Sequence, residues 1–156
     1  MSITTSEFSD LYNNKLQYLD SIFRTYGKKS NFSGSIVTLK CFEDTLSIQN
    51  QIKNPGKGKV LIIDGGASET FSLFNENLSL EAIKNQWEGI IINGCVRNSR
   101  KMNELEIGVK ALGECIRPSG QRKTGENNVE IEVAGIKITE GDIVVASSGN
   151  SYCKTA

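Results

Sequence analysis

Two short apolar runs, separated by a segment of helical length, constrain the fold of this chain most strongly. Residues 60–63 read Val-Leu-Ile-Ile, and residues 89–92 read Gly-Ile-Ile-Ile. Continuous β-branched runs of this length are typical of strands that are covered on both faces of a sheet. Between them, Leu80, Ile83 and Trp87 follow a helical spacing, which predicts a helix with one buried stripe and a core role for Trp87. The three segments together predict a βαβ unit.

Each apolar run ends in glycine and polar residues. The first is followed by Asp-Gly-Gly-Ala-Ser at residues 64–68, and the second by Asn-Gly-Cys-Val-Arg-Asn at residues 93–98. Ligands of parallel sheets bind at the carboxyl ends of strands, so the candidate site lies here. The glycine pair lacks the spacing of a dinucleotide fingerprint and favours a tight turn. Asp64 is interpreted as an acceptor for that turn, the alternative being a carboxylate that lines the cleft.

The rest of the chain mixes helical and strand patterns. Helices are predicted at residues 4–13 and 47–52, and a short helical turn at residues 102–105. Residues 18–23 also show a helical spacing, but this segment could be irregular. Residues 34–41 and 107–112 are predicted strands, and alternation over residues 129–146 predicts antiparallel strands. Residues 118–128 are a predicted exposed loop, and residues 147–156 a loose tail. These patterns predict one α/β domain over residues 1–156 with a mixed sheet.

Charge and cysteine content exclude several functions. Eighteen basic residues balance eighteen acidic ones, which gives no field for nucleic acid or anionic lipid, so direct binding to either is not expected. The four cysteines lack zinc-site spacing, and the chain has no histidine, which excludes Ser-His and Cys-His nucleophiles. Cys41 and Cys95 are interpreted as buried reduced thiols. The acidic N-terminus and the lack of a transmembrane run predict a cytoplasmic protein.

Several stretches together match one family. They are residues 5–7, 32–34, 38–44, 64–68, 86–89, 93–97, 104–108, 141–142 and 149–150. On these motifs the chain resembles the regulator of ribonuclease activity A family over nearly its whole length. Related members include pyruvate-releasing aldolases that split 4-hydroxy-4-methyl-2-oxoglutarate. The resemblance implies a swivelling β/β/α architecture, a ring-like homotrimer, and two functions of different classes.

The resemblance to the aldolases implies site residues. Arg97 matches the arginine that binds the keto-acid, which makes it the candidate catalytic and substrate-binding residue. A guanidinium can form hydrogen bonds with a carboxylate and with the adjacent keto oxygen. The competing interpretation is that Arg97 forms an ion pair within the protein. The family's substrate loop aligns with Asn75, Glu76, Asn77 and Leu78, at a predicted helix start whose N–H groups suit a carboxylate. Asn75 replaces a usual glycine, so helix capping is its alternative role.

The chain departs from the aldolase pattern directly after the arginine. The aspartate that helps hold a divalent metal in the aldolases is here Asn98, and the acidic residue three positions later is Lys101. A neutral amide can ligate Mg²⁺ or Mn²⁺, but it lacks the charge that compensates the cation for lost water. Asn98 is therefore a weakened metal ligand, and a site with Arg97, Arg100 and Lys101 favours anions.

The main functional hypothesis is a regulator that resembles inhibitors of ribonuclease E and modulates RNA turnover by protein–protein binding, without catalysis or cofactor. The regulator branch of the family also lacks the aspartate after the arginine. Its partners are a ribonuclease E-like or helicase protein, bound through basic segments that acidic side chains could receive. The acidic candidates are Glu104, Glu106, Glu130 and Glu132. The alternative is a divalent-metal-dependent aldolase or oxaloacetate decarboxylase that releases pyruvate. A third possibility is that the chain keeps the fold and serves another interaction.

Overall fold

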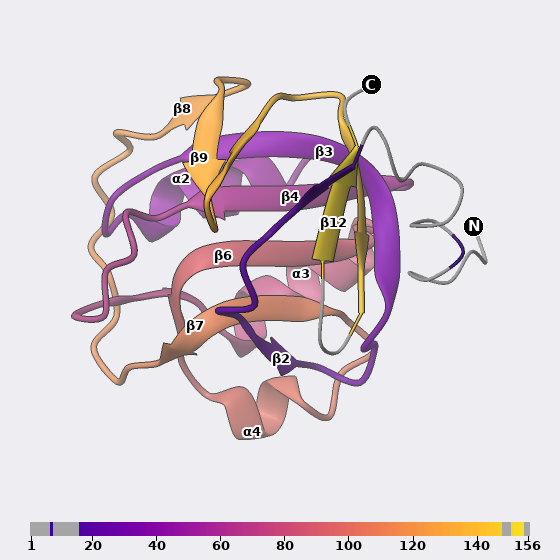
Figure 1. The fold of residues 1–156 in the computed structure, drawn as a ribbon. Coiled ribbons are helices and arrows are strands. Elements are labelled where there is room, and N and C mark those ends of the chain that lie inside the picture. Colours follow the sequence, from indigo (N-terminus) through magenta and orange to yellow (C-terminus); the bar gives the residue numbers. More distant parts are fainter. Residues whose placement is uncertain (1–6, 8–15, 148–150, 155–156) are drawn as a thin grey trace.

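A large mixed sheet forms the centre of the structure (Figure 1). The computed structural model describes residue 7, residues 16–147 and residues 151–154. The strands of the sheet are β1 (Leu16–Tyr18), β2 (Arg24–Tyr26), β3 (Phe32–Lys40), β4 (Lys59–Asp64), β5 (Ser72–Phe74), β6 (Gly89–Val96), β7 (Val109–Glu114), β8 (Glu126–Asn127), β11 (Ile143–Ala146) and β12 (Ser151–Lys154). Within the described residues, these ten strands follow the order β1-β12-β11-β3-β4-β6-β7-β2, with β5 added to β6 and β8 added to β3. The mixed α/β class predicted from the sequence is confirmed.

Helices and a separate hairpin complete the fold. The hairpin consists of β9 (Ile131–Val133) and β10 (Ile136–Ile138), and the helices are α2 (Thr45–Ile52), α3 (Glu76–Lys84) and α4 (Ser99–Met102). Strands β3, β4, β6 and β7 run parallel to one another, while β1, β2, β8, β11 and β12 pair antiparallel. The predicted βαβ unit is confirmed as β4-α3-β6. No helix in the described part of the chain has the length and apolar character that crossing a membrane requires.

The parallel strands are covered on both faces. Leu61 and Ile63 of β4 pack into a core with α2 and α3, whereas Val60 and Ile62 pack into a second core with the β9-β10 hairpin. Successive side chains of a strand point to opposite faces, so a continuous apolar run supplies both cores at once. Figure 1 shows α2 and α3 behind the sheet and β9 in front of it.

Helix α3 does not bury the predicted stripe. It ends at Lys84, and Gln86 then takes a left-handed conformation with φ 66°, so Trp87 lies beyond the helix. The buried face of α3 consists of Leu78, Ser79 and Ala82, while Leu80 is 47% exposed. Trp87 is nevertheless a core residue, and its Nε1 donates a hydrogen bond to the Ile52 carbonyl at 3.0 Å.

Other predicted bounds differ at the sheet edges. Residues 18–23 are not helical, because β1 ends at Tyr18 and β2 begins at Arg24. The predicted tail contains β12, which pairs with both β1 and β11. Helix α4 and strand β7 form close to their predicted positions, with bounds shifted by two or three residues. The predicted helix at residues 4–13 lies, except for Glu7, outside the described residues.

The alternating segment near the C-terminus forms as predicted. Ile131 and Val133 are buried and Glu132 is exposed, as the pattern requires of a strand with one wet face. Ala134 and Gly135 both have positive φ, 50° and 83°, and close the two-residue turn between β9 and β10. Two central residues with positive φ give the turn a twist that matches the flanking strands.

The buried carboxylate of Asp44 joins the start of α2 to a distant loop. Its Oδ1 accepts hydrogen bonds from the N–H groups of Leu46 and Arg122, both at 3.1 Å. Its Oδ2 accepts from Ser47 Oγ at 2.7 Å and from the Thr124 N–H at 2.8 Å. Burial raises the pKa of Asp44, but the hydrogen bonds from Ser47 and from the backbone of residues 122–124 outweigh this effect and lower the pKa to about 2. The predicted loop at residues 118–128 is thus held to α2.

Replacing Asp44 by asparagine is expected to lower the free energy of unfolding at neutral pH by roughly 2 kcal/mol. The folded-state pKa lies below the unfolded one, so the ionised group stabilises the fold above about pH 4 and loses this effect as the pH falls toward about 2. Urea denaturation should therefore show that the difference in free energy of unfolding between wild type and Asp44→Asn is smaller at about pH 3 than at neutral pH. Glu130→Gln removes an exposed carboxylate and is the matched control. An equal difference at both pH values would contradict the ionic role.

Candidate functional site

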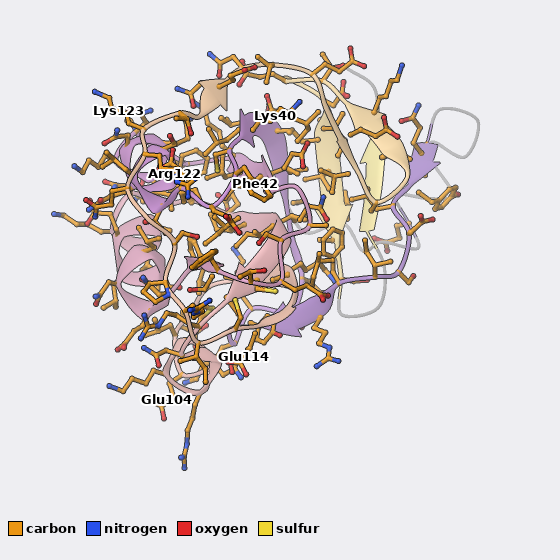
Figure 2. The ribbon with its side chains drawn as sticks, turned by 90° about the vertical axis from the view of Figure 1, so that its left-hand side faces the viewer. Lys40, Phe42, Glu104, Glu114, Arg122 and Lys123 are labelled. Atoms are coloured by element: carbon orange, nitrogen blue, oxygen red, sulfur yellow. The ribbon has the colours of Figure 1, made fainter. Side chains whose placement is uncertain are left out.

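The carboxyl ends of the parallel strands meet at one end of the sheet, which Figure 2 shows from outside. In the register of these strands, Lys40 of β3 lies beside Asp64 of β4, and Asp64 lies beside Asn93 of β6. Arg97 and Asn98 follow directly after β6. The structure therefore brings together the strand ends that the sequence predicted to form a site.

The turn after β4 is fixed by backbone hydrogen bonds. The Asn93 carbonyl accepts from the N–H groups of Gly65 and Ala67, both at 3.1 Å. Asp64 Oδ1 accepts from the Gly66 N–H at 3.0 Å, which confirms the turn role of this carboxylate. Gly66 has φ 68°, and a Cβ at this position would lie 2.7 Å from the Phe42 ring, so glycine is required here.

Arg97 lies next to the start of α3 because of one backbone hydrogen bond. Its N–H donates to the Phe74 carbonyl at 2.9 Å, which joins the end of β6 to the end of β5. Asn75 follows immediately and caps α3, with its side-chain oxygen accepting from the Leu78 N–H at 2.9 Å. Helix geometry leaves the N–H groups of Glu76 and Asn77 outside the intrahelical ladder. The capping role of Asn75 is thus observed, and ligand contact by residues 75–78 stays a prediction.

Asn98 initiates the short helix α4. It has a left-handed conformation, φ 58° and ψ 42°, and its side chain forms no capping hydrogen bond. The next N–H, that of Ser99, donates instead to Glu114 Oε1 at 3.0 Å. Lys101 Nζ lies 4.0 Å from Glu76 Oε2, so this lysine pairs with the first residue of α3.

The donor set at this position does not fit a divalent cation. Within the described residues, no three histidine, cysteine, aspartate or glutamate side chains are placed to hold a metal together. Asn98 offers a neutral oxygen, and Lys101 adds a positive charge where the aldolase pattern has an acid. Hard cations prefer several anionic oxygens, so the affinity of this site for Mg²⁺ or Mn²⁺ is expected to be low.

The thiols near the site are poor nucleophiles. Burial, followed by the nearby Cys115 thiol and the Glu69 carboxylate, raises the pKa of Cys95 to about 11. Burial, with the carboxylates of Asp44 and Asp64, raises the pKa of Cys41 to about 12. Both thiols are protonated at neutral pH, and only the thiolate reacts. Their interpretation as buried apolar residues is confirmed.

The acidic candidates do not form one patch. Glu104 and Glu106 follow α4, whereas Glu130 and Glu132 belong to the β9 segment, on the opposite side of the molecule in Figure 1. In Figure 2, Glu104 and Glu114 occupy the lower part of the site face, while Lys40, Arg122 and Lys123 occupy the upper part. The lower part also carries α4, with the basic residues Arg100 and Lys101, so acids and bases are mixed there.

Two exposed apolar side chains at this end of the sheet were not predicted. Phe42 follows β3 and is 53% exposed, and Ile116 follows β7 and is 86% exposed. Both are isolated apolar residues in polar segments, so no periodic pattern indicates their exposure.

Comparison with known proteins identifies the family. The RraA-like family, described as Aldolase/RraA, matches residues 5–149 of this chain. The chain belongs to the RraA-like family. The family expectation from the sequence motifs is therefore confirmed.

Relatives of this RraA-like protein carry different names. A protein of Arabidopsis thaliana, named "Putative 4-hydroxy-4-methyl-2-oxoglutarate aldolase 3", is 43% identical over 136 residues, which cover 87% of this chain and 82% of the relative. The RNA-processing inhibitor RraA of Thermus thermophilis superposes with a TM-score of 0.94 at 30% identity, covering 99% of this chain and 93% of the other. A structure from Geobacillus kaustophilus, described as an S-adenosylmethionine:2-dimethylmenaquinone methyltransferase, superposes with a TM-score of 0.93 at 30% identity. The match covers 99% of this chain and 96% of the other. The shared fold thus accompanies three different functional names.

Truncating the cap of α3 tests the observed role of Asn75. Asn75→Ala is expected to lower the free energy of unfolding by about 1 kcal/mol, because the Leu78 N–H loses its acceptor. Asn75→Asp should retain the cap and benefit from the helix dipole. Urea denaturation measures both, with Asn77→Ala, at an exposed position in the same turn, as the control. An equal loss of free energy of unfolding in Asn75→Ala and Asn77→Ala would contradict the capping role of Asn75.

Proposed function

We propose that this RraA-like chain is a cytoplasmic, non-catalytic regulator that inhibits a ribonuclease E-like enzyme, or a helicase associated with it, by protein–protein binding. The observation that carries the proposal is the pair of residues after Arg97, where Asn98 and Lys101 replace two acids of the aldolase pattern. A site without those acids binds a hard cation weakly, and the proposed regulator requires no cofactor. The similarity to the RNA-processing inhibitor RraA supports the same function.

The surface at the carboxyl end of the sheet supports protein binding. Phe42 and Ile116 expose apolar area at the same end as Arg97. Exposed apolar side chains next to polar ones mark protein contact sites, and in this protein they would serve a homotrimer interface or the regulated partner. We propose a homotrimer as the working assembly, with the partner bound to the remaining part of this face.

The exposed acids that follow α4 are the proposed contact for the partner. Glu104 and Glu106 are exposed beside α4, and Glu114 lies in the same lower part of the face as Glu104. Basic segments of a partner would bind there, because opposite charges steer association and fix its register. Direct contact with RNA is not part of the proposal, since the chain has no net charge.

An inhibition assay tests the regulator proposal directly. Purified protein should slow cleavage of a model RNA by ribonuclease E carrying its helicase-binding region, and binding should weaken as salt is raised. The double variant Glu104→Gln/Glu106→Gln should need roughly three- to tenfold more protein for the same inhibition, because lost rim charges reduce the rate of association. Glu130→Gln/Glu132→Gln, on the other side of the molecule, is the matched control. No inhibition by the wild type, or equal effects of both pairs, would contradict the proposal.

A second candidate, a pyruvate-releasing lyase, is favoured by one specific contact. The hydrogen bond from the Arg97 N–H to the Phe74 carbonyl joins the backbone of Arg97 to the segment just before α3, whose first N–H groups lie outside the intrahelical ladder. This arrangement suits a keto-acid, whose carboxylate Arg97 would bind while the helix start binds a second carboxylate. The aldolase name of the Arabidopsis relative agrees with it. Under this candidate a divalent cation, Mg²⁺ or Mn²⁺, would be required, and the donors at Asn98 fit it poorly.

A coupled assay separates the two candidates. Pyruvate release is measured from 4-hydroxy-4-methyl-2-oxoglutarate and from oxaloacetate, with Mg²⁺ or Mn²⁺ present. The regulator proposal expects no turnover above the uncatalysed rate. Turnover that is lost in Arg97→Ala but kept in Arg100→Ala, the neighbouring arginine, would establish the lyase and overturn the regulator proposal.

Position 98 itself can be tested by restoring the acid. Asn98→Asp is expected to increase the affinity for Mg²⁺ about tenfold, because a carboxylate compensates the cation for lost water. Full lyase activity is not expected, since Lys101 still replaces the second acid. Calorimetric titration measures the affinity, with Asn127→Asp on β8 as the control. Equal affinities of wild type and Asn98→Asp would show that residue 98 does not contact the metal.

A further inference from the structure

A second concave region lies at the other end of the sheet from Arg97. It encloses about 490 Å³ and is lined by residues of β3, the end of α2, the start of β4, and the segment before β11. This volume is within the range of roughly 300–1,000 Å³ that small-molecule sites occupy. None of the residues at the candidate functional site contributes to its wall.

The hollow exists because β3 changes partners. Strand β11 pairs with β3 as far as Ser35, and β8 begins to pair only at Leu39. Between these points, loop residues and not a strand hydrogen-bond the edge of β3. Gly141 donates to the Ile36 carbonyl at 3.0 Å, the Asp142 carbonyl accepts from the Ile36 N–H at 2.7 Å, and Asn128 donates to the Thr38 carbonyl at 3.1 Å. The edge is therefore partly uncovered, and side chains from both layers surround the opening.

Gln51 is the feature of the hollow that indicates a ligand. Its side chain is only 9% exposed, yet its amide forms no hydrogen bond with any described residue. Among the described side chains, the only fully enclosed polar atom without a partner is Ser119 Oγ, so the Gln51 amide must be reached from the hollow. A nearly buried amide on the wall of a hollow can hydrogen-bond a group that binds there. This amide has both a donor and an acceptor to offer.

Opposite charges line the same hollow. Lys59 forms no ion pair within the described residues and lines the wall at the start of β4. Glu140 lines it from the segment before β11, where the Asn128 amide, in the orientation that satisfies both groups, donates to its Oε1 at 2.6 Å. No ion pair joins Lys59 to Glu140, so each charge is available to a ligand. Ile36 and Trp87 supply apolar contact.

We propose that this hollow is a binding site for a free α-amino acid. Lys59 would bind the carboxylate and Glu140 the ammonium group, while the Gln51 amide would hydrogen-bond the ligand between them. A simple anion would use only Lys59, and a simple cation only Glu140, so a zwitterion uses the site most completely. The inference is independent of the proposed regulator function, because the two sites share no residue.

Trp87, the single tryptophan of the chain, is a built-in probe of the hollow. The full-length protein is titrated with L-glutamine, L-glutamate and L-alanine, and binding is followed by Trp87 fluorescence and by calorimetry. At least one of these amino acids should bind with a dissociation constant below about 10 mM. Removing either charge of that amino acid, by N-acetylation or by amidation of the carboxylate, should lower its affinity for the hollow about tenfold. Inorganic phosphate and ethylammonium should not compete.

Variants test the three assigned roles. Lys59→Gln and Glu140→Gln should each weaken binding about tenfold, and both positions are exposed, so the fold is expected to be retained. Gln51→Leu should also weaken binding, because the amide that would hydrogen-bond the ligand is removed. Lys57→Gln and Glu130→Gln are the controls, at exposed positions outside the hollow. Absence of binding by both methods, equal binding of capped and free amino acids, or equal losses in the controls would overturn the proposal.

Discussion

The burial of β4 and β6 on both faces is the constraint on which the rest of the structure depends. Residues 60–63 and 90–92 have no exposed surface. Because side chains alternate between the faces of a strand, two apolar layers must cover these strands, one of helices and one made by the β9-β10 hairpin. Polar side chains are thereby excluded from the middle of β4 and β6. The two sites described above lie at the strand ends and at the edge of β3.

Local patterns predicted the centre of the fold and failed at its edges. The βαβ unit, the β9-β10 hairpin and the turn at Asp64 follow from residues close in sequence, and each was predicted. Strands β1 and β2 were missed because their partners are distant in sequence, and such short pairings leave no periodic signal. Strand β12 was missed although it pairs with the neighbouring β11, because residues 147–156 were interpreted as a loose tail. In the same way, the position of Arg97 could be predicted from the strand order. The contacts of Gln51 and of Asp44 could not, since they depend on segments that only folding brings together.

The family fold does not determine the activity. Two structures superpose with TM-scores of 0.94 and 0.93, yet one is described as an inhibitor of RNA processing and the other as a methyltransferase. The aldolase name belongs to a relative with 43% identity. Function must therefore be argued from side chains at the strand ends. The regulator proposal depends on Asn98 and Lys101, because these two residues differ in charge from the acids of the aldolase pattern.

The pairing of β12 with β11 has a consequence for the order in which the chain is made. Strand β8 pairs only with the end of β3, so the first part of β3 acquires its outer neighbour only when residues 143–146 are synthesised. Residues 151–154 then cover that neighbour. At ordinary rates of translation, the 40 residues from Glu114 to Lys154 take roughly 2 to 8 seconds. During that interval the nascent sheet has an uncovered edge, which is the state in which strands of neighbouring chains pair wrongly. Chaperones that bind near the ribosome exit would therefore meet this protein with its parallel strands already made and its outer edge still open.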